Sequence, residues 1–162
     1  MDASWQRRAA LLGGALGLVA LDQLTKALAR GALGQLDTIM LIPGVLHLTA
    51  TENTGSLFGL LKGQQLPLIA LSVAVIGVLV YLVLAGKLPE ERLVRICAVL
   101  LLAGALGNLV DRVLRGAVFD FVDVQIWPIF NMADAMLSFG VIGLLVREVF
   151  PRLRASSPSS RR

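Results

Sequence analysis

Four long apolar stretches dominate the pattern along the chain. They lie at about Ala9–Ala29, Leu66–Ala85, Leu93–Leu114 and Phe130–Phe150. Each has the roughly 20 residues that an α-helix needs to cross the hydrocarbon core of a bilayer. The second has no charged residue, and its Pro67 lies near the start, where proline costs a helix no hydrogen bond. The pattern predicts an all-α membrane protein with four transmembrane helices.

The segment between the first two predicted helices, Arg30–Gln65, is too long for a bare turn. Within it, apolar and polar residues roughly alternate in Val45–Thr51 (VLHLTAT), and several are β-branched, as is typical of a strand. Pro43 and Gly44 directly before it indicate a turn. We therefore expect a small extracytoplasmic β element between the first and second helices, lying on the outer surface of the membrane that they span.

The distribution of basic residues predicts the orientation. One side of the predicted helices holds ten of the 15 lysines and arginines, and the other holds five, namely Lys26, Arg30, Lys62, Arg112 and Arg115. The richer side is expected to be cytoplasmic, which places both termini in the cytoplasm. Residues 1–150 then form a single integral membrane domain, and residues 151–162 a disordered cytoplasmic tail of low complexity. The N-terminus also has the outline of a cleavable signal peptide, but Asp22 and Lys26 fit that outline poorly.

Composition narrows the possible chemistry. The chain is 56% hydrophobic and 16% charged, and its net charge of +4 comes from short basic segments between helices and at the end, so no nucleic-acid partner is expected. Cys97 is the only cysteine and His47 the only histidine. An intrachain disulfide, a cysteine-based zinc site and a histidine-rich metal centre are therefore excluded, and no cofactor is expected. A Ser-His-Asp hydrolase would have to use His47.

Polar side chains gather at one predicted depth, near the outer ends of the helices. Asp22 and Lys26, four residues apart, share one face of the first helix. Asn108, Asp111 and Arg112 occupy the third helix, Asn131 and Asp134 open the fourth, and Asp120 and Asp123 lie in the connecting loop. Polar faces on otherwise lipid-compatible helices indicate a functional site by default.

Structural interpretations compete with the functional one. Asp22 and Lys26 could form only a structural ion pair, and Asp111 with Arg112 an ordinary interfacial pair. Asn131 with Asp134 has the spacing of a helix N-cap and its partner three residues later. Asp120 is harder to explain by folding, because an acid between two phenylalanines near a membrane edge has little structural purpose.

Two carboxylates on opposing elements would support aspartic-protease chemistry. Like charges in contact cannot both ionise, so such a pair shares one proton near neutral pH. The N-terminus of the fourth helix favours the anion at Asp134. The apolar rings around Asp120, in the predicted loop, disfavour its ionisation. Asp134 is therefore the expected general base, and Asp120 the expected holder of the proton.

Five ordered blocks make the chain resemble the lipoprotein signal peptidases (signal peptidase II) from Asp22 to Phe139. The blocks are DQLTK (22–26), IPGVLHLT (42–49), NTGSLFGLL (53–61), GNLVDR…GAVFDFVD (107–123) and FNMADA (130–135). The resemblance implies an aspartyl endopeptidase of the bacterial inner membrane. Such an enzyme removes the signal peptide of a prolipoprotein just before its diacylglyceryl-modified cysteine.

The resemblance also implies roles for particular residues. The catalytic pair falls on Asp120 and Asp134. Supporting or substrate-binding roles fall on Asp22, Lys26, Asn53, Asn108, Asp111, Arg112 and Asn131. The implied partners are lipid-modified prolipoproteins, membrane lipids and globomycin-like cyclic peptide inhibitors, and the protein is expected to be a monomer.

The chain departs from the family pattern at a few positions. Ser56 and Leu57 replace two alanines, and Ala135 stands where serine is common, which puts hydrogen bonding around Asp134 in doubt. The alternative from another class is a small ion or proton transporter that uses intramembrane carboxylates. Internal repeats and broken helices, which are usual in transporters, are not visible in the sequence.

Overall fold

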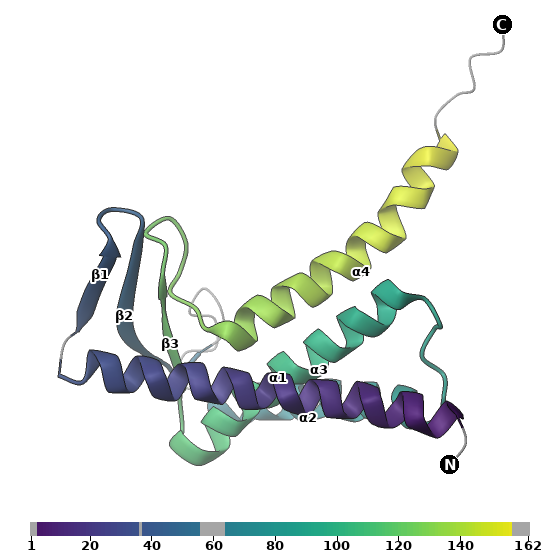
Figure 1. Ribbon diagram of the computed structural model, residues 1–162, viewed down its shortest axis with the longest axis horizontal. Helices are drawn as coiled ribbons and strands as arrows, with labels where there is room; N and C mark the ends of the chain where they lie inside the picture. Colours follow the sequence, from purple (N-terminus) through teal and green to yellow (C-terminus); the bar gives the residue numbers. More distant parts are fainter. Residues whose placement is uncertain (1–2, 36, 56–63, 157–162) are drawn as a thin grey trace, which may run out of the picture.

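Four helices and a small three-stranded sheet make up the computed structural model, which describes residues 3–35, 37–55 and 64–156. Figure 1 shows the sheet gathered at one end of the long helices. In chain order the elements are α1 (Ala3–Leu33), β1 (Thr38–Ile42), β2 (Leu46–Asn53), α2 (Gln65–Leu84), α3 (Arg92–Arg115), β3 (Val118–Asp123) and α4 (Met132–Ser156).

The four helices coincide with the four apolar stretches of the sequence. Three of them, α1, α2 and α3, are long and apolar enough to cross a membrane. The protein is therefore mostly helical, with three candidate membrane spans among the described residues. Helix α4 runs on to Ser156, into the segment predicted to be a disordered tail; residues 157–162 lie outside the described residues.

Helix α3 is the centre of the bundle and packs against each of the other three helices. Small residues let α4 approach it closely: a β-carbon built on Gly104 would lie 2.5 Å from the backbone oxygen of Ala133. At Gly107 it would lie 2.6 Å from a carboxylate oxygen of Asp22 on α1. Close approach at small residues is a principal source of helix association in membranes. The buried core at this level consists of Ala15, Leu102, Ala103, Ala133 and Met136.

The sheet has the order β1-β2-β3, and both pairs of strands are antiparallel. The strand predicted at Val45–Thr51 is confirmed as β2, and β1 precedes it as a hairpin partner. The third strand, β3, comes from a different part of the chain, directly after α3. Gly116 ends α3 with a positive φ of 76°, and the chain then enters β3. The sheet is thus not confined to the segment between the first two helices.

Strand β3 corrects the expectation that Asp120 lies in a loop. Asp120 pairs with Thr51 of β2, and Phe119 with Glu52. Because side chains alternate along a strand, Phe119 and Phe121 share one face, where they pack with Ala29 and Leu33 of α1. The two aromatic rings around Asp120 therefore attach the sheet to α1, and the acid itself points away from them.

Candidate active site

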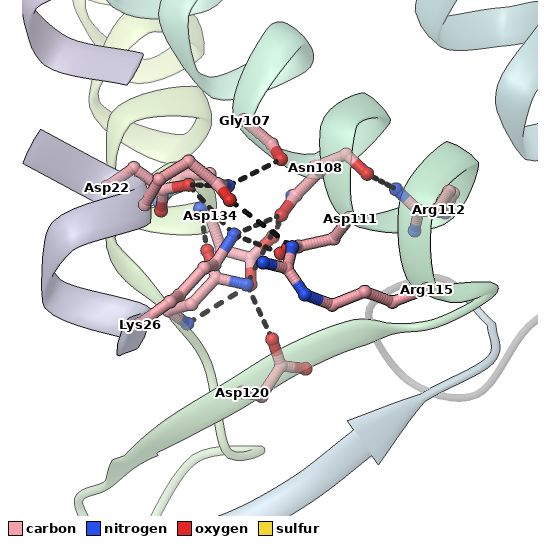
Figure 2. Close-up of polar contacts among 12 residues, drawn as sticks. Asp22, Lys26, Gly107, Asn108, Asp111, Arg112, Arg115, Asp120 and Asp134 are labelled. Atoms are coloured by element: carbon pink, nitrogen blue, oxygen red, sulfur yellow. Dashed lines mark hydrogen bonds and ion pairs between the residues drawn. The ribbon is translucent and has the colours of Figure 1, made fainter. Parts of the chain in front are cut away.

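A fully buried charge cluster joins α1 to α3. The Nζ of Lys26 lies 2.9 Å from Asp22 and 2.7 Å from Asp111, and all three side chains are 0% exposed. The expected ion pair of Asp22 with Lys26 is confirmed. The second oxygen of Asp22 accepts the backbone N–H of Ala133 at 2.9 Å, so the cluster also holds the first turn of α4. Figure 2 shows these groups converging from separate elements.

The side-chain amide of Asn108 connects this cluster to Asp134. Its Oδ1 accepts from Lys26 Nζ at 3.3 Å and from Asn131 Nδ2 at 3.3 Å. An ammonium group can only donate, so the contact with Lys26 fixes which end of the amide is the oxygen. The opposite end, Nδ2, donates to Asp134 Oδ1 at 2.8 Å.

Asn131 caps α4 and contacts both acids of the proposed pair. Its Oδ1 accepts the backbone N–H of Asp134 at 3.0 Å, and its own backbone N–H donates to Asp134 Oδ2 at 3.2 Å. This reciprocal arrangement confirms the predicted N-cap. The remaining polar group of Asn131, Nδ2, donates to Asp120 Oδ1 at 2.6 Å. One residue thus donates to both carboxylates: the side-chain amide of Asn131 contacts Asp120 on β3, and its backbone N–H contacts Asp134 on α4.

Asp120 is buried at 1% exposure and receives hydrogen bonds on both oxygens. Besides Asn131, Asn53 on β2 donates its Nδ2 to Asp120 Oδ2 at 2.9 Å. The orientation of Asn53 is also fixed, since its Oδ1 accepts the backbone N–H of Gly55. Burial, followed by the nearby charge of Asp134, raises the pKa of Asp120 to about 7, against the opposing effect of the two asparagine hydrogen bonds.

Arg112 and Asp111 do not pair with each other, contrary to one interpretation of the sequence. Arg112 donates to the backbone oxygens of Gly55 at 3.1 Å and of Asn108 at 3.4 Å. Asp111 is contacted instead by Lys26 and by Arg115, whose Nη1 lies 2.6 Å away. Adjacent residues on a helix point in different directions, whereas residues four apart share a face, so Arg115 is the natural partner.

The structure brings all the expected site residues into one hydrogen-bonded network. The network also includes two residues, Arg115 and Gln23, that the sequence did not assign to the site. Arg115 closes the charge cluster on Asp111, and Gln23 donates to Asp22 and accepts from Arg115. The spacing of Asp111 and Arg115 was a usable signal. Asp123 lies outside the network: it accepts from Thr49 and from the backbone N–H of Gln125. Ser56 and Leu57 lie outside the described residues.

Asp134 faces two apolar grooves. One, of about 250 Å³, lies between α2, α3 and α4 and is lined by Leu68, Leu71, Val75 and Leu137 together with the polar groups of Asn108, Arg112 and Asp134. The other, of about 380 Å³, runs along the start of α4 and is lined by Trp127, Phe130, Asp134, Ala135, Ser138 and Phe139. Asp120 lines neither groove, so the two acids differ in access. Among the described residues, no three His, Cys, Asp or Glu side chains are placed to hold a metal ion.

Comparisons with known proteins agree over most of the chain. A family model described as signal peptidase (SPase) II matches residues 14–150. The lipoprotein signal peptidase of Shouchella clausii is 39% identical over 148 residues, covering 91% of this chain and 97% of the relative. That of Moorella thermoacetica is 39% identical over 138 residues, covering 85% and 91%.

A solved structure of a bacterial membrane enzyme superposes with a TM-score of 0.80 at 30% identity, covering 95% of this chain and 94% of that one. A second such structure has a TM-score of 0.74 at 33% identity, covering 86% and 92%. The family match supports the peptidase and not the transporter. The chain therefore belongs to the signal peptidase II family, a family of aspartic-type membrane proteases.

Proposed function

We propose that this protein is the endopeptidase that removes the signal peptide from diacylglyceryl-modified prolipoproteins, and that Asp120 and Asp134 perform the cleavage. The observation that carries the residue assignment is the shared contact with Asn131, which donates from its side chain to the carboxylate of Asp120 on a strand and from its backbone to the carboxylate of Asp134 on a helix. The names of the relatives supply the substrate class.

The two acids hold one proton between them in the resting state. Asp120, with its pKa raised to about 7, holds the shared proton, and Asp134 carries the negative charge. Asp134 takes a proton from water as the water oxygen attacks the scissile carbonyl carbon. Asp120 donates its proton to the carbonyl oxygen, which gives a tetrahedral gem-diol. As the C–N bond breaks, Asp134 returns a proton to the leaving nitrogen, and Asp120 regains one from the collapsing diol.

The surrounding network positions this pair. Lys26 fixes the amide of Asn108, which then presents Nδ2 to Asp134. Asn53 and Asn131 present donors to the two oxygens of Asp120 in the same way. Because each amide oxygen is already used, none of these amides can flip without breaking a second hydrogen bond. Asp22 and Asp111 act one step further away, by holding Lys26.

The grooves suit a substrate that is apolar on both sides of its cleavage site. A signal peptide has an apolar helical stretch, and the lipidated cysteine carries two acyl chains. The groove between α2, α3 and α4 and the groove along the start of α4 meet at Asp134, where the scissile bond would lie. Arg112 lines the first groove and would face the polar part of the bound substrate.

The placement in the membrane follows from the same assignment. We infer that α4 is the fourth span, that both termini are cytoplasmic and that the carboxylates lie near the outer leaflet of the bacterial inner membrane. Helix α4 has 25 residues, about 37 Å at 1.5 Å per residue, and packs along α3. A cysteine introduced at Gln35 should react with an impermeant thiol reagent in spheroplasts, and one at Lys87 should not. Labelling in the opposite pattern would reverse the orientation.

The cleavage itself is tested with purified protein and a synthetic diacylated prolipoprotein. Loss of the signal peptide should appear as a shift on a gel, and a globomycin-like cyclic peptide should block it. The unlipidated precursor is the matched control and should not be cleaved. Failure to cleave the lipidated substrate by a correctly folded, membrane-inserted preparation would overturn the proposal. Size measurement in detergent tests the expected monomer.

A further inference from the structure

The end of the bundle far from Asp134 contains two cavities that join. The first, of about 140 Å³, lies between the start of α1, the end of α2 and the connection to α3, and is lined by Arg7, Arg8 and Arg95. The second, of about 290 Å³, runs between α1 and α3 and is lined mainly by aliphatic side chains, among them Leu18, Ile96 and Val99. Leu11, Glu90 and Arg95 line both, so the charged cavity opens into the apolar one.

The apolar cavity has a simple origin in the helix packing. Helices α1 and α3 approach each other where Gly14 faces Val99, at 3.8 Å from the position of a β-carbon. Toward the N-terminal ends of α1 and α3 the two helices diverge, as Figure 1 shows. The lining on α3 extends from Arg92 to Leu100, or about 12 Å along the helix axis. The result is an open apolar groove between α1 and α3, called the channel below, with charged groups at one end.

Positive charge exceeds negative charge at this entrance. Glu90 lies 3.6 Å from Arg7 and 3.3 Å from Arg95, and its side chain is 83% exposed. Exposed pairs of this kind contribute little to stability, so the carboxylate is easily displaced. Arg92 lines the apolar cavity beside Arg95 and adds a further cation. Arg8 is committed elsewhere, because it donates to the backbone oxygen of Leu84 at 2.7 Å.

We propose that these joined cavities bind a phospholipid with an anionic headgroup. The phosphate lies between the guanidinium groups of Arg7 and Arg95 in place of the Glu90 carboxylate, and one acyl chain occupies the channel between α1 and α3. Guanidinium groups bind phosphate through paired, charge-assisted hydrogen bonds, which a neutral headgroup with a compensating cation satisfies less well. The lipid joins α1 to α3 at the level where they otherwise separate.

The site is independent of the carboxylate pair. The cavity end nearest to Asp22 is at Leu18, about 6 Å before it along α1, and neither Asp120 nor Asp134 lines either cavity. A lipid bound here therefore contacts none of the groups to which cleavage is assigned, and its binding is measured without any peptidase assay.

Native mass spectrometry of the full chain in neutral detergent tests this proposal. Phosphatidylglycerol should be retained in preference to phosphatidylcholine with the same acyl chains. Arg95→Gln should weaken phosphatidylglycerol retention roughly fivefold, and Arg7→Gln with Arg95→Gln roughly 10- to 30-fold. Lys87→Gln is the matched control, because it removes one positive charge at the same end but lines neither cavity. Glu90→Gln should strengthen retention, since no carboxylate then competes with the phosphate.

Two further experiments distinguish binding of the whole lipid from binding of its headgroup alone. Ile96→Trp places a large side chain in the channel and should lower phosphatidylglycerol retention while the thermal transition in detergent persists. Glycerophosphoglycerol, the headgroup without acyl chains, should not compete at concentrations at which the lipid saturates. Equal retention of the two lipids, equal effects of Arg95→Gln and Lys87→Gln, or full competition by the headgroup alone would each overturn the proposal.

Discussion

Two pairs of aspartates lie in one network, and they differ in what stands between them. Asp22 and Asp111 have the ammonium group of Lys26 within 2.9 Å and 2.7 Å, so their negative charges are compensated where they are buried. Asp120 and Asp134 are joined instead by a neutral residue, Asn131, whose side-chain Nδ2 donates to Asp120 and whose backbone N–H donates to Asp134. A buried charge is stable when paired and strongly perturbed when it is not. The first pair is therefore suited to holding the helices together, and the second to exchanging a proton.

The largest expected effect comes from breaking the second pair. Asp120→Asn and Asp134→Asn should each reduce cleavage by about 10²–10⁴-fold, because each removes a group that carries a proton in the proposed mechanism. Both variants keep nearly the original side-chain volume, so both should still insert and bind the lipidated substrate. Substantial cleavage by either variant, measured by the gel shift, would sink the assignment of that residue.

Breaking the first pair should act on stability. Lys26→Met leaves two buried carboxylates facing each other and should cost about 3–5 kcal/mol of folding free energy, measured by thermal or denaturant unfolding in detergent. Adding Asp22→Asn to Lys26→Met should recover part of that loss, because Asp22 is then the carboxylate without a cation, whereas Asp111 keeps Arg115 at 2.6 Å. Asp111→Asn alone should lower stability and activity together. If it kept full thermal stability but lost all turnover, Asp111 would belong with the reacting pair.

The pH dependence of stability distinguishes Asp120 from Asp123, although both belong to β3. The pKa of Asp120 rises on folding from 3.8 to about 7, so its contribution to stability is present below about pH 4 and is lost as the pH rises through 7. The pKa of Asp123 is lowered by the backbone hydrogen bond from Gln125, so its contribution is present above its unfolded pKa and lost as the pH falls.

Unfolding measured from about pH 2 to pH 8 checks both signs, because the contribution of Asp123 is lost only below its unfolded pKa of 3.8. Asp120→Asn should flatten the decline toward pH 8, whereas Asp123→Asn should leave that decline in place. Infrared spectra near neutral pH should also show a protonated-carboxyl band that shifts when the carboxyl carbon of Asp120 is isotopically labelled. A shift on labelling Asp134 instead would reverse the two roles.

The smallest effect is expected at Asp123, the acid of the same motif that lies outside the network. Asp123→Asn removes the charge and one of the two acceptor oxygens, which serve Thr49 and the turn at Gln125. A change at a partly exposed position of this kind should alter stability by no more than about 0.5 kcal/mol. Cleavage should stay close to that of the unchanged protein. A loss comparable to that of Asp120→Asn would place Asp123 among the groups that act on the substrate.

The sequence predicted the helices and the convergence of the polar groups well, because both follow from local periodicity. Runs of apolar residues determine a helix, and the spacing of Asp22 with Lys26 and of Asn131 with Asp134 determines a shared face. The strand at Asp120 was not predicted. Its partner in β2 is far away in sequence, with Asn53 opposite Val118, and a six-residue strand has little local signal without that partner.

The sequence also could not predict all the ion-pair partners of Asp111. The spacing of four residues already favours Arg115 over Arg112, but only the packing of α1 on α3 brings Lys26 to Asp111. The orientation of the asparagine amides was beyond sequence reasoning for the same reason. Each is determined by what contacts its oxygen, which for Asn108 is a lysine on another helix.

The hydrogen bond from the Ala133 backbone to Asp22 joins the first helix to the last, 111 residues apart in the chain. During synthesis α1 emerges first, and its buried carboxylate lacks this donor until α4 has been made. In the proposed mechanism the nascent protein then contains one of the two reacting acids, Asp120 on β3, but not yet Asp134, which lies on α4. We therefore expect proteolytic competence to appear only when the final helix docks, so that an incompletely made chain does not cut its neighbours in the membrane.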